Sequence, residues 1–314
     1  KDWHTLIKGE RPNRPIDFML QAYASVQENR SNAAFAPTPA DDQMLGQALT
    51  ALTRTNAGAP DGSARMNSAV ATEFRTAAEN ATLAELTRAL NDEVAQFCKT
   101  EIAPFYPFSG GSSRHLSPSI FGQFFGPGGK MDQFYSQHLA PYVIRTSDGL
   151  RADPGTAVGQ RLSGSALAQF DRAQKIQRAF FASGSPTPEV NMSIKHVTSS
   201  PGVGLANLNI HGKTIPTQPD STPAGFSWPG ETAGVSIELI PTRIGNQATF
   251  EFSQGRWDIA KWLADGAPKV QGNVVTVRYT IRGQSITYRI EFDSSTVPFL
   301  MRELRDFSCP TSLE

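Results

Sequence analysis

The stretch VVTVRYTIRGQSITYRIEF, which spans residues 274–292, carries the clearest fold signal in the chain. Apolar and polar residues alternate on both sides of the dipeptide Arg282-Gly283. An alternation with period two puts one side of a strand in the protein core and the other side in solvent. We therefore predict a β-hairpin over 274–292 that turns at Arg282-Gly283.

The same alternation recurs in three other stretches, over 190–197, 235–239 and 248–252. A segment rich in Ser, Gly and Pro, residues 183–188, separates them from the sequence upstream. One short helix is expected near 257–263, between the strands. Six or so strands over about 110 residues are typical of an antiparallel sandwich.

Upstream of residue 185, apolar residues recur at intervals of three and four, which is the period of an amphipathic helix. These helical stripes cover 16–26, 44–52, 66–74, 83–97, 120–125, 131–142 and 167–180. Ser117-Pro118 is typical of an N-cap followed by a first-turn proline, and Thr82 with Glu85 resembles a capping box. We expect 150–159 to be a loop.

The last segment, 297–314, returns to helical spacing, with apolar residues such as Phe299, Leu304 and Phe307. So many apolar side chains should pack on the body of the protein or on a partner. The sequence therefore predicts an α+β fold. It has an N-terminal all-helical domain over 1–185, an antiparallel β-sandwich domain over 186–296 and a short C-terminal helical tail over 297–314.

Composition and charge exclude several classes of protein. The 314 residues contain 29 Lys+Arg and 29 Asp+Glu, so the formal net charge is zero. A basic nucleic-acid binder and an acidic disordered tail are both excluded by this balance. No run of about 18 apolar residues occurs, so we predict no membrane span. Because the chain starts at Lys1, we interpret it as a processed protein or an excised fragment.

The motifs that usually carry chemistry are incomplete in this sequence. The loop Gly126–Lys130 ends in Gly-Lys, but Met131 follows where a P-loop needs a hydroxyl for magnesium. The five histidines form no ligand pair, and no serine has glycine two residues away on both sides. We predict no catalytic residue, cofactor or metal. A dispersed pair of carboxylates, as in glycosidases, stays open as an alternative.

Two features leave alternatives open. Cys98 and Cys309 could form one bridge in an oxidising compartment or remain two buried thiols. Trp228 follows a proline-rich run and could anchor its loop onto the sandwich or project toward a partner. Phe226 and Trp228, within the loop 216–230, are our candidate partner-binding residues.

Several short sequence motifs occur in an order that is typical of one protein family. Phe97-Cys98 precedes Tyr106-Pro107-Phe108, and the Phe124–Gly129 stretch reads FFGPGG. Further on come Arg178-Ala179-Phe180-Phe181, Trp228-Pro229-Gly230, Gly255-Arg256-Trp257, Pro298-Phe299 and Phe307-Ser308-Cys309-Pro310. In this order the chain resembles, over about residues 90–314, the C-terminal periplasmic region of the IcmF-like TssM family of bacterial type VI secretion systems. Ser308 stands where the family usually has arginine.

The resemblance implies a structural role. Proteins of this family are anchored in the inner membrane by upstream helices, and their periplasmic end binds the outer-membrane lipoprotein TssJ. With TssL, and with further copies of themselves, they form an envelope-spanning complex. For this chain the resemblance implies a periplasmic, non-catalytic scaffold that docks TssJ through its β-domain.

Two further expectations concern the cysteine pair and an alternative function. A bridge between Cys98 and Cys309 is predicted to tie the tail to the helical domain, and it would close a loop of about 210 residues. The alternative function is a periplasmic glycan-binding or peptidoglycan-remodelling hydrolase, which would need paired acids or aromatic platforms in a cleft.

Overall fold

The computed structural model describes residues 61–216, 222–242, 248–251 and 255–314. The helices predicted over 16–26 and 44–52 lie outside these residues. The described residues form two compact units. One unit comprises 61–89, 152–162 and Leu313, and the other comprises 90–151, 163–312 and Glu314.

The helical part is confirmed in part: most of the described residues upstream of 185 are helical, and the exceptions are given below. Its elements are α4 (Asp61–Leu90), η2 (Asn91–Ala95), η3 (Cys98–Ile102), α5 (Pro118–Phe125), α6 (Lys130–Phe134), η4 (Tyr135–Leu139), η5 (Ala140–Tyr142), η6 (Gly159–Arg161) and α7 (Gly164–Phe180). The elements η2, η3 and η4 are π-helical turns. The loop Gly126–Lys130 is a turn between α5 and α6, and Gly128 there has a φ of 67°.

Of the two predicted helix starts, one is confirmed and one is wrong. The Ser117 hydroxyl accepts the Ile120 N–H at 3.1 Å, and Pro118 opens α5. Thr82, in contrast, lies well inside α4, where its hydroxyl donates to the Ala78 carbonyl at 3.1 Å. A threonine hydroxyl can bond the carbonyl four residues back without ending a helix, so its spacing to Glu85 was misleading.

A short β-ribbon corrects the prediction of an all-helical first domain. It also makes 150–152 of the predicted loop 150–159 a strand, whereas 153–158 form turns and loop as expected. Strand β1 (Val143–Thr146) pairs with β2 (Gly149–Ala152) in a separate two-stranded sheet. Gly149 has a φ of 123°, and a Cβ there would lie 2.9 Å from the Asp171 carboxylate. The ribbon thus depends on close contact with α7, which local periodicity does not report.

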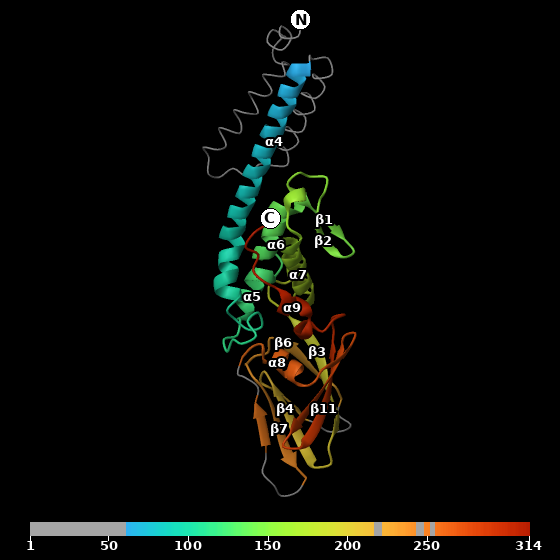
Figure 1. The fold of residues 1–314 in the computed structure, drawn as a ribbon. Helices are drawn as coiled ribbons and strands as arrows, with labels where there is room; N and C mark the ends of the chain where they lie inside the picture. The colour runs from blue at the N-terminus through green and yellow to red at the C-terminus, as the bar shows by residue number, and fades with distance from the viewer. Residues whose placement is uncertain (1–60, 217–221, 243–247, 252–254) are drawn as a thin grey trace. The chain divides into compact units, whose positions relative to one another are not determined.

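The predicted sandwich is confirmed, with more strands than expected. The chain order is β3 (Val190–Ser199), β4 (Val203–Ile210), β5 (Lys213–Pro216), β6 (Ala224–Trp228), β7 (Val235–Pro241), β8 (Ala248–Glu251), α8 (Asp258–Asp265), β9 (Lys269–Gln271), β10 (Val274–Ile281) and β11 (Gln284–Phe292). One sheet has the order β6-β3-β11-β10-β9 and the other β5-β4-β7-β8. Figure 1 shows representatives of both sheets, β3 with β11 and β4 with β7.

The hairpin predicted over 274–292 forms the centre of the five-stranded sheet. Ile281 pairs with Gln284, so Arg282 and Gly283 are the two turn residues. Their φ values of 51° and 79° are those a tight hairpin turn requires. Along β10 and β11 the apolar residues are buried and the polar ones face outward, as the alternation predicts.

The C-terminal segment packs on the body of the larger unit, as expected. It forms the turn η7 (Pro298–Leu300) and the short helix α9 (Arg302–Asp306). Phe299, Leu304 and Phe307 are buried. Lys175 of α7 reaches Glu303 of α9 at 3.7 Å, so the tail contacts the helix that leads into the sandwich.

Candidate partner-docking segment and the aromatic junction

The candidate loop 216–230 is a strand over 224–228 rather than a loop: this part forms β6, an edge strand that pairs with β3. Alternation along β6 turns Phe226 and Trp228 inward, where they are 7% and 0% exposed. The anchoring interpretation of Trp228 therefore describes this structure. On the outward side of β6, Gly225 and Ser227 are exposed, and the outer edge of the strand leaves backbone groups for a partner to pair with. Whether a partner binds here stays a prediction.

Trp228 is held by a cluster of rings where helices and sandwich meet. Its Nε1–H donates to the Arg256 carbonyl at 2.6 Å, and its ring lies 4.7 Å from that of Trp257. Phe180 from the end of α7 and Phe299 from the tail complete the cluster at 5.7 and 5.4 Å from Trp228. We call Phe180, Trp228, Trp257 and Phe299 the aromatic junction.

Trp257 joins the sandwich to the helical residues directly. Its indole N–H donates to the Leu116 carbonyl at 2.8 Å, and its backbone N–H donates to His115 Nδ1 at 3.2 Å. Its ring meets Phe121 of α5 edge-on at 5.1 Å. Trp257 is fully buried, so these contacts form in a dry environment where hydrogen bonds are costly to leave unmade.

A buried acid and a histidine lie beside this tryptophan. Asp258 is fully buried and accepts the Gly255 N–H at 2.6 Å. Because His115 Nδ1 accepts from Trp257, the proton of the neutral ring sits on Nε2, which lies 3.6 Å from Asp258 Oδ1. Burial lowers the pKa of His115, and Lys261 lowers it further, while Asp258 opposes both.

The chain after β6 is clamped by one arginine. The Arg256 guanidinium donates to the carbonyls of Gly230 at 2.5 Å, Thr232 at 3.0 Å and Glu231 at 3.2 Å. His211 lies close to Gly230 of this loop, and its ring is edge-on to Phe226 at 5.7 Å. Neither ring nitrogen of His211 has a hydrogen-bond partner among the described residues. The pKa of His211 is lowered to about 4, mainly by burial. The charge of Asp258 raises this pKa, and the charge of Arg256 lowers it.

This buried histidine predicts a loss of stability in acid. The unfolded chain takes up a proton near pH 6.5, while folded His211 takes it up only near pH 4. Its contribution to stability is complete above pH 6.5 and declines as the pH falls below that value. From pH 7.5 to 5.0 we expect a loss of about 2 kcal/mol from His211.

Urea unfolding of the wild type and of His211→Asn at the two pH values tests this prediction. Asn tolerates the positive φ of 46° at this position and does not titrate. The variant should lose less stability than the wild type between the two pH values. Equal losses in both proteins would contradict the prediction.

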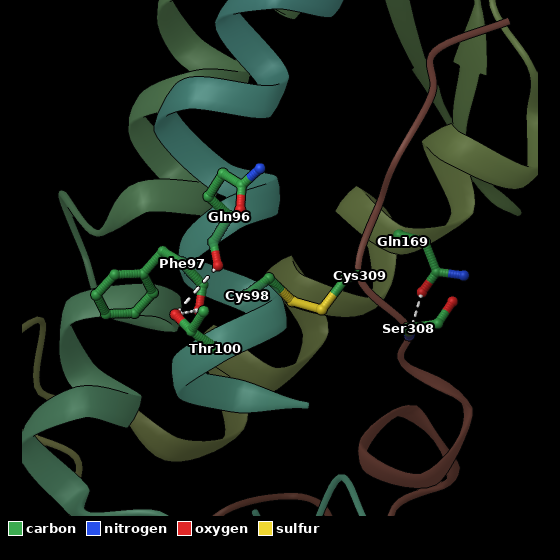
Figure 2. Close-up of a disulfide and its surroundings, with 7 residues drawn as sticks. All are labelled: Gln96, Phe97, Cys98, Thr100, Gln169, Ser308 and Cys309. Atoms are coloured by element: carbon green, nitrogen blue, oxygen red, sulfur yellow. Dashed lines mark hydrogen bonds between the residues drawn. A yellow bond between two sulfur atoms is a disulfide. The ribbon is translucent and has the colours of Figure 1, made fainter. Parts of the chain in front are cut away.

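Cys98 and Cys309 are joined in a disulfide, with Cα atoms 5.6 Å apart. Figure 2 shows Cys309 on the C-terminal segment reaching Cys98 on the helical segment. Next to the bridge, the Ser308 N–H donates to Gln169 Oε1 of α7 at 2.9 Å. The tail is thereby attached to two separate helical elements of the larger unit.

Two hollows in the described part of the surface have no acidic side chain in their walls. The larger of the two described hollows lies between the α5–α6 turn and Pro186–Pro188, and the other lies beside the disulfide. Among the described residues, no group of three or more His, Cys, Asp or Glu could hold a metal ion. No helix in the described part of the chain has the length and apolar character to cross a bilayer.

Sequence reasoning missed the side chains that organise this region. Arg256 and Trp257 were noted only within the motif Gly255-Arg256-Trp257 that supports the family resemblance. No local sequence pattern marked His115 or Asp258 as part of this region. Trp257 bonds Leu116 and His115, about 140 residues away in the chain, and Arg256 bonds carbonyls 24–26 residues away. The exception is Trp228, whose anchoring role was one of the two alternatives.

The fold defines a β-sandwich module joined to helices through a dry aromatic junction. Residues 192–294 match the family model described as "Type VI secretion protein IcmF C2-like domain". The chain is 30% identical over 234 residues to "Type VI secretion system component TssM1" from Pseudomonas aeruginosa PAO1. This match covers 73% of the chain but only 21% of that relative, so the chain spans about a fifth of its length.

Solved structures share the fold. The chain superposes on a chain of a "Type VI secretion system membrane core complex" with a TM-score of 0.75 at 16% identity, over 99% of this chain and 69% of that one. It also superposes on the TssM C-terminal domain from EAEC, with a TM-score of 0.61 at 17% identity, over 74% of this chain and 98% of that one. The family model and the relative TssM1 confirm the resemblance to a TssM C-terminal region of the IcmF family, and the superpositions show the same fold.

Proposed function

We propose that this chain is a non-catalytic, periplasmic component of a type VI secretion membrane complex and docks the outer-membrane lipoprotein TssJ through its β-domain. Association with TssL and with further copies of the same protein belongs to this proposal. The main observation in its favour is the family match over residues 192–294. In addition, buried polar groups such as the indole N–H groups of Trp228 and Trp257 are used in hydrogen bonds that hold the fold together.

Two structural features support the proposal. The aromatic junction holds helices and sandwich as one unit, so that the loops and edge strands of the sandwich form a preformed surface. Preformed surfaces lose little conformational entropy on binding. The disulfide suits an oxidising compartment such as the periplasm.

The alternative hydrolase function gains nothing from the structure. A glycosidase needs two carboxyl groups across a cleft, and the two described hollows have none in their walls. The buried Asp258 faces His115 and Gly255 inside the junction, where a glycan does not reach it. We therefore retain docking as the function.

Calorimetry with the soluble part of TssJ tests the proposal. We expect a complex at concentrations on the order of 10 µM that buries about 1,200–2,000 Å² in total. An absence of both heat and co-elution would contradict docking.

A pair of variants tests where TssJ binds. Ser227→Arg places a bulky side chain on the outward side of β6, whereas Ser147→Arg does so in the exposed turn of the β1–β2 ribbon. Ser227→Arg should weaken binding at least about tenfold, because a bulky charged side chain that separates two packed surfaces costs more than about 1.4 kcal/mol. Ser147→Arg should leave the affinity unchanged. Wild-type affinity of Ser227→Arg would remove β6 from the interface.

A further inference from the structure

The outward side of the five-stranded sheet carries a row of cations fixed by strand register. Lys269 of β9 pairs with Thr276 of β10, Thr276 pairs with Arg289 of β11, and Arg289 pairs with Lys195 of β3. Neighbouring strands lie about 4.8 Å apart, so the four Cα positions span roughly 15 Å. Three of the four positions are Lys or Arg.

A fourth cation lies next to this row. Arg278 is two residues along β10 from Thr276, hence on the same side of the sheet. Its guanidinium donates to the Ser285 hydroxyl at 3.2 Å, which holds it along the sheet surface. We call Lys195, Lys269, Arg278 and Arg289 the cationic row, and all four are exposed or largely so.

Within the described residues, the one carboxylate on this part of the face is Glu291, which pairs with Arg289 at 2.9 Å. Four cations and one anion leave a local charge of +3, although the whole chain has a net charge of zero. Like charges directly across a strand pair, as at Lys195 and Arg289, destabilise a sheet. They also lie well within the screening length of about 8 Å at physiological salt. Glu291 offsets one of the four charges, and the remaining positive charge would be neutralised by an anionic partner.

The rest of the face favours a protein as that partner. Small hydroxyl side chains, Ser193, Thr276, Thr280, Ser285 and Thr287, surround the cations and make the surface flat and polar. Membrane-surface binding usually adds a large apolar face. Among the described residues, Val197 is the one large exposed apolar side chain on the same side of this sheet as the row, because the pairing of Val270 with the buried Val275 places Val270 on the other side. Arginine also binds carboxylates through paired N–H groups, which gives a protein contact its orientation.

We propose that the cationic row is a docking surface for a protein that presents a cluster of carboxylates. This inference rests on the proposed function, because it assumes that the chain works by binding other proteins of the complex. It adds the surface and the chemistry of the partner.

The test is a variant with three charge reversals, introduced into the gene for this protein in its host bacterium. Lys195→Glu, Arg278→Glu and Arg289→Glu are combined, and the matched control combines Arg145→Glu, Arg151→Glu and Arg305→Glu, three exposed residues outside the sandwich. The readout is the set of envelope proteins that co-purify with the tagged protein, with thermal unfolding of each purified variant as a check of folding.

We expect the triple variant to lose at least one co-purifying component by tenfold or more, while the control retains all of them. A basic substitution in an acidic cluster of that component should restore it. Wild-type co-purification of the triple variant would overturn the proposal. Loss of binding to vesicles of anionic phospholipid, with all protein components retained, would overturn it in favour of a membrane. The proposed function is tested independently: if it is wrong, the wild-type protein does not bind TssJ.

Discussion

Replacing Trp257 by alanine is expected to lower the free energy of unfolding by about 3–5 kcal/mol. The side chain is fully buried and contacts rings from α5, α7, β6 and the tail. Its indole N–H also satisfies the Leu116 carbonyl, which the variant leaves without this donor inside the protein. Urea unfolding followed by fluorescence or circular dichroism measures the loss.

A second tryptophan provides the matched control for Trp257. Trp262 is equally buried, but the rings that it contacts, Tyr279 and Tyr288, belong to the sandwich alone. Both alanine variants should be destabilised. Only Trp257→Ala should open the connection at 183–188 to limited proteolysis, because only this variant weakens the aromatic junction. Equal cleavage in both variants would contradict the junction role of Trp257.

Breaking the disulfide is the second large effect. The bridge closes a sequence separation of 211 residues and attaches the tail to the helices. Cross-links over long loops stabilise mainly by restricting the unfolded chain, so replacing both Cys98 and Cys309 by serine should cost about 2–5 kcal/mol. Thermal unfolding in the presence and absence of a reductant measures this cost.

The reductant provides an internal control for the disulfide. It should lower the melting temperature of the wild type to nearly that of the double variant and leave the double variant unchanged. A wild type that melts at the same temperature in both buffers would contradict a stabilising bridge. Protease cleavage within 301–314 after reduction would show that the tail is the segment released.

These effects explain why the docking proposals can be tested one at a time. The junction and the disulfide lie inside the larger unit, whereas Ser227 and the cationic row lie on its exposed sheet face. Substitutions on the face change charge or shape with little change in packing, and those inside change stability. A variant that keeps its stability but loses a partner therefore reports on the interface.

Local pattern was sufficient for most of the secondary structure. The strands β3, β7, β10 and β11 and the cap at Ser117 follow from residues adjacent in the chain, because alternation and capping are local properties. The change from helical to strand period near 185 was predicted for the same reason. The capping box at Thr82 failed because a local motif is also compatible with a helix interior.

Long-range contacts decided the rest. The β1–β2 ribbon forms where Gly149 fits against Asp171, and Trp228 is buried because Phe180, Trp257 and Phe299 come together from three distant segments. The cationic row likewise exists only through the register of four strands. Periodicity specifies which side chains of a segment share a face. The pairing and packing of distant segments then determine what that face meets, and the energy of those contacts is spread over residues far apart in the chain.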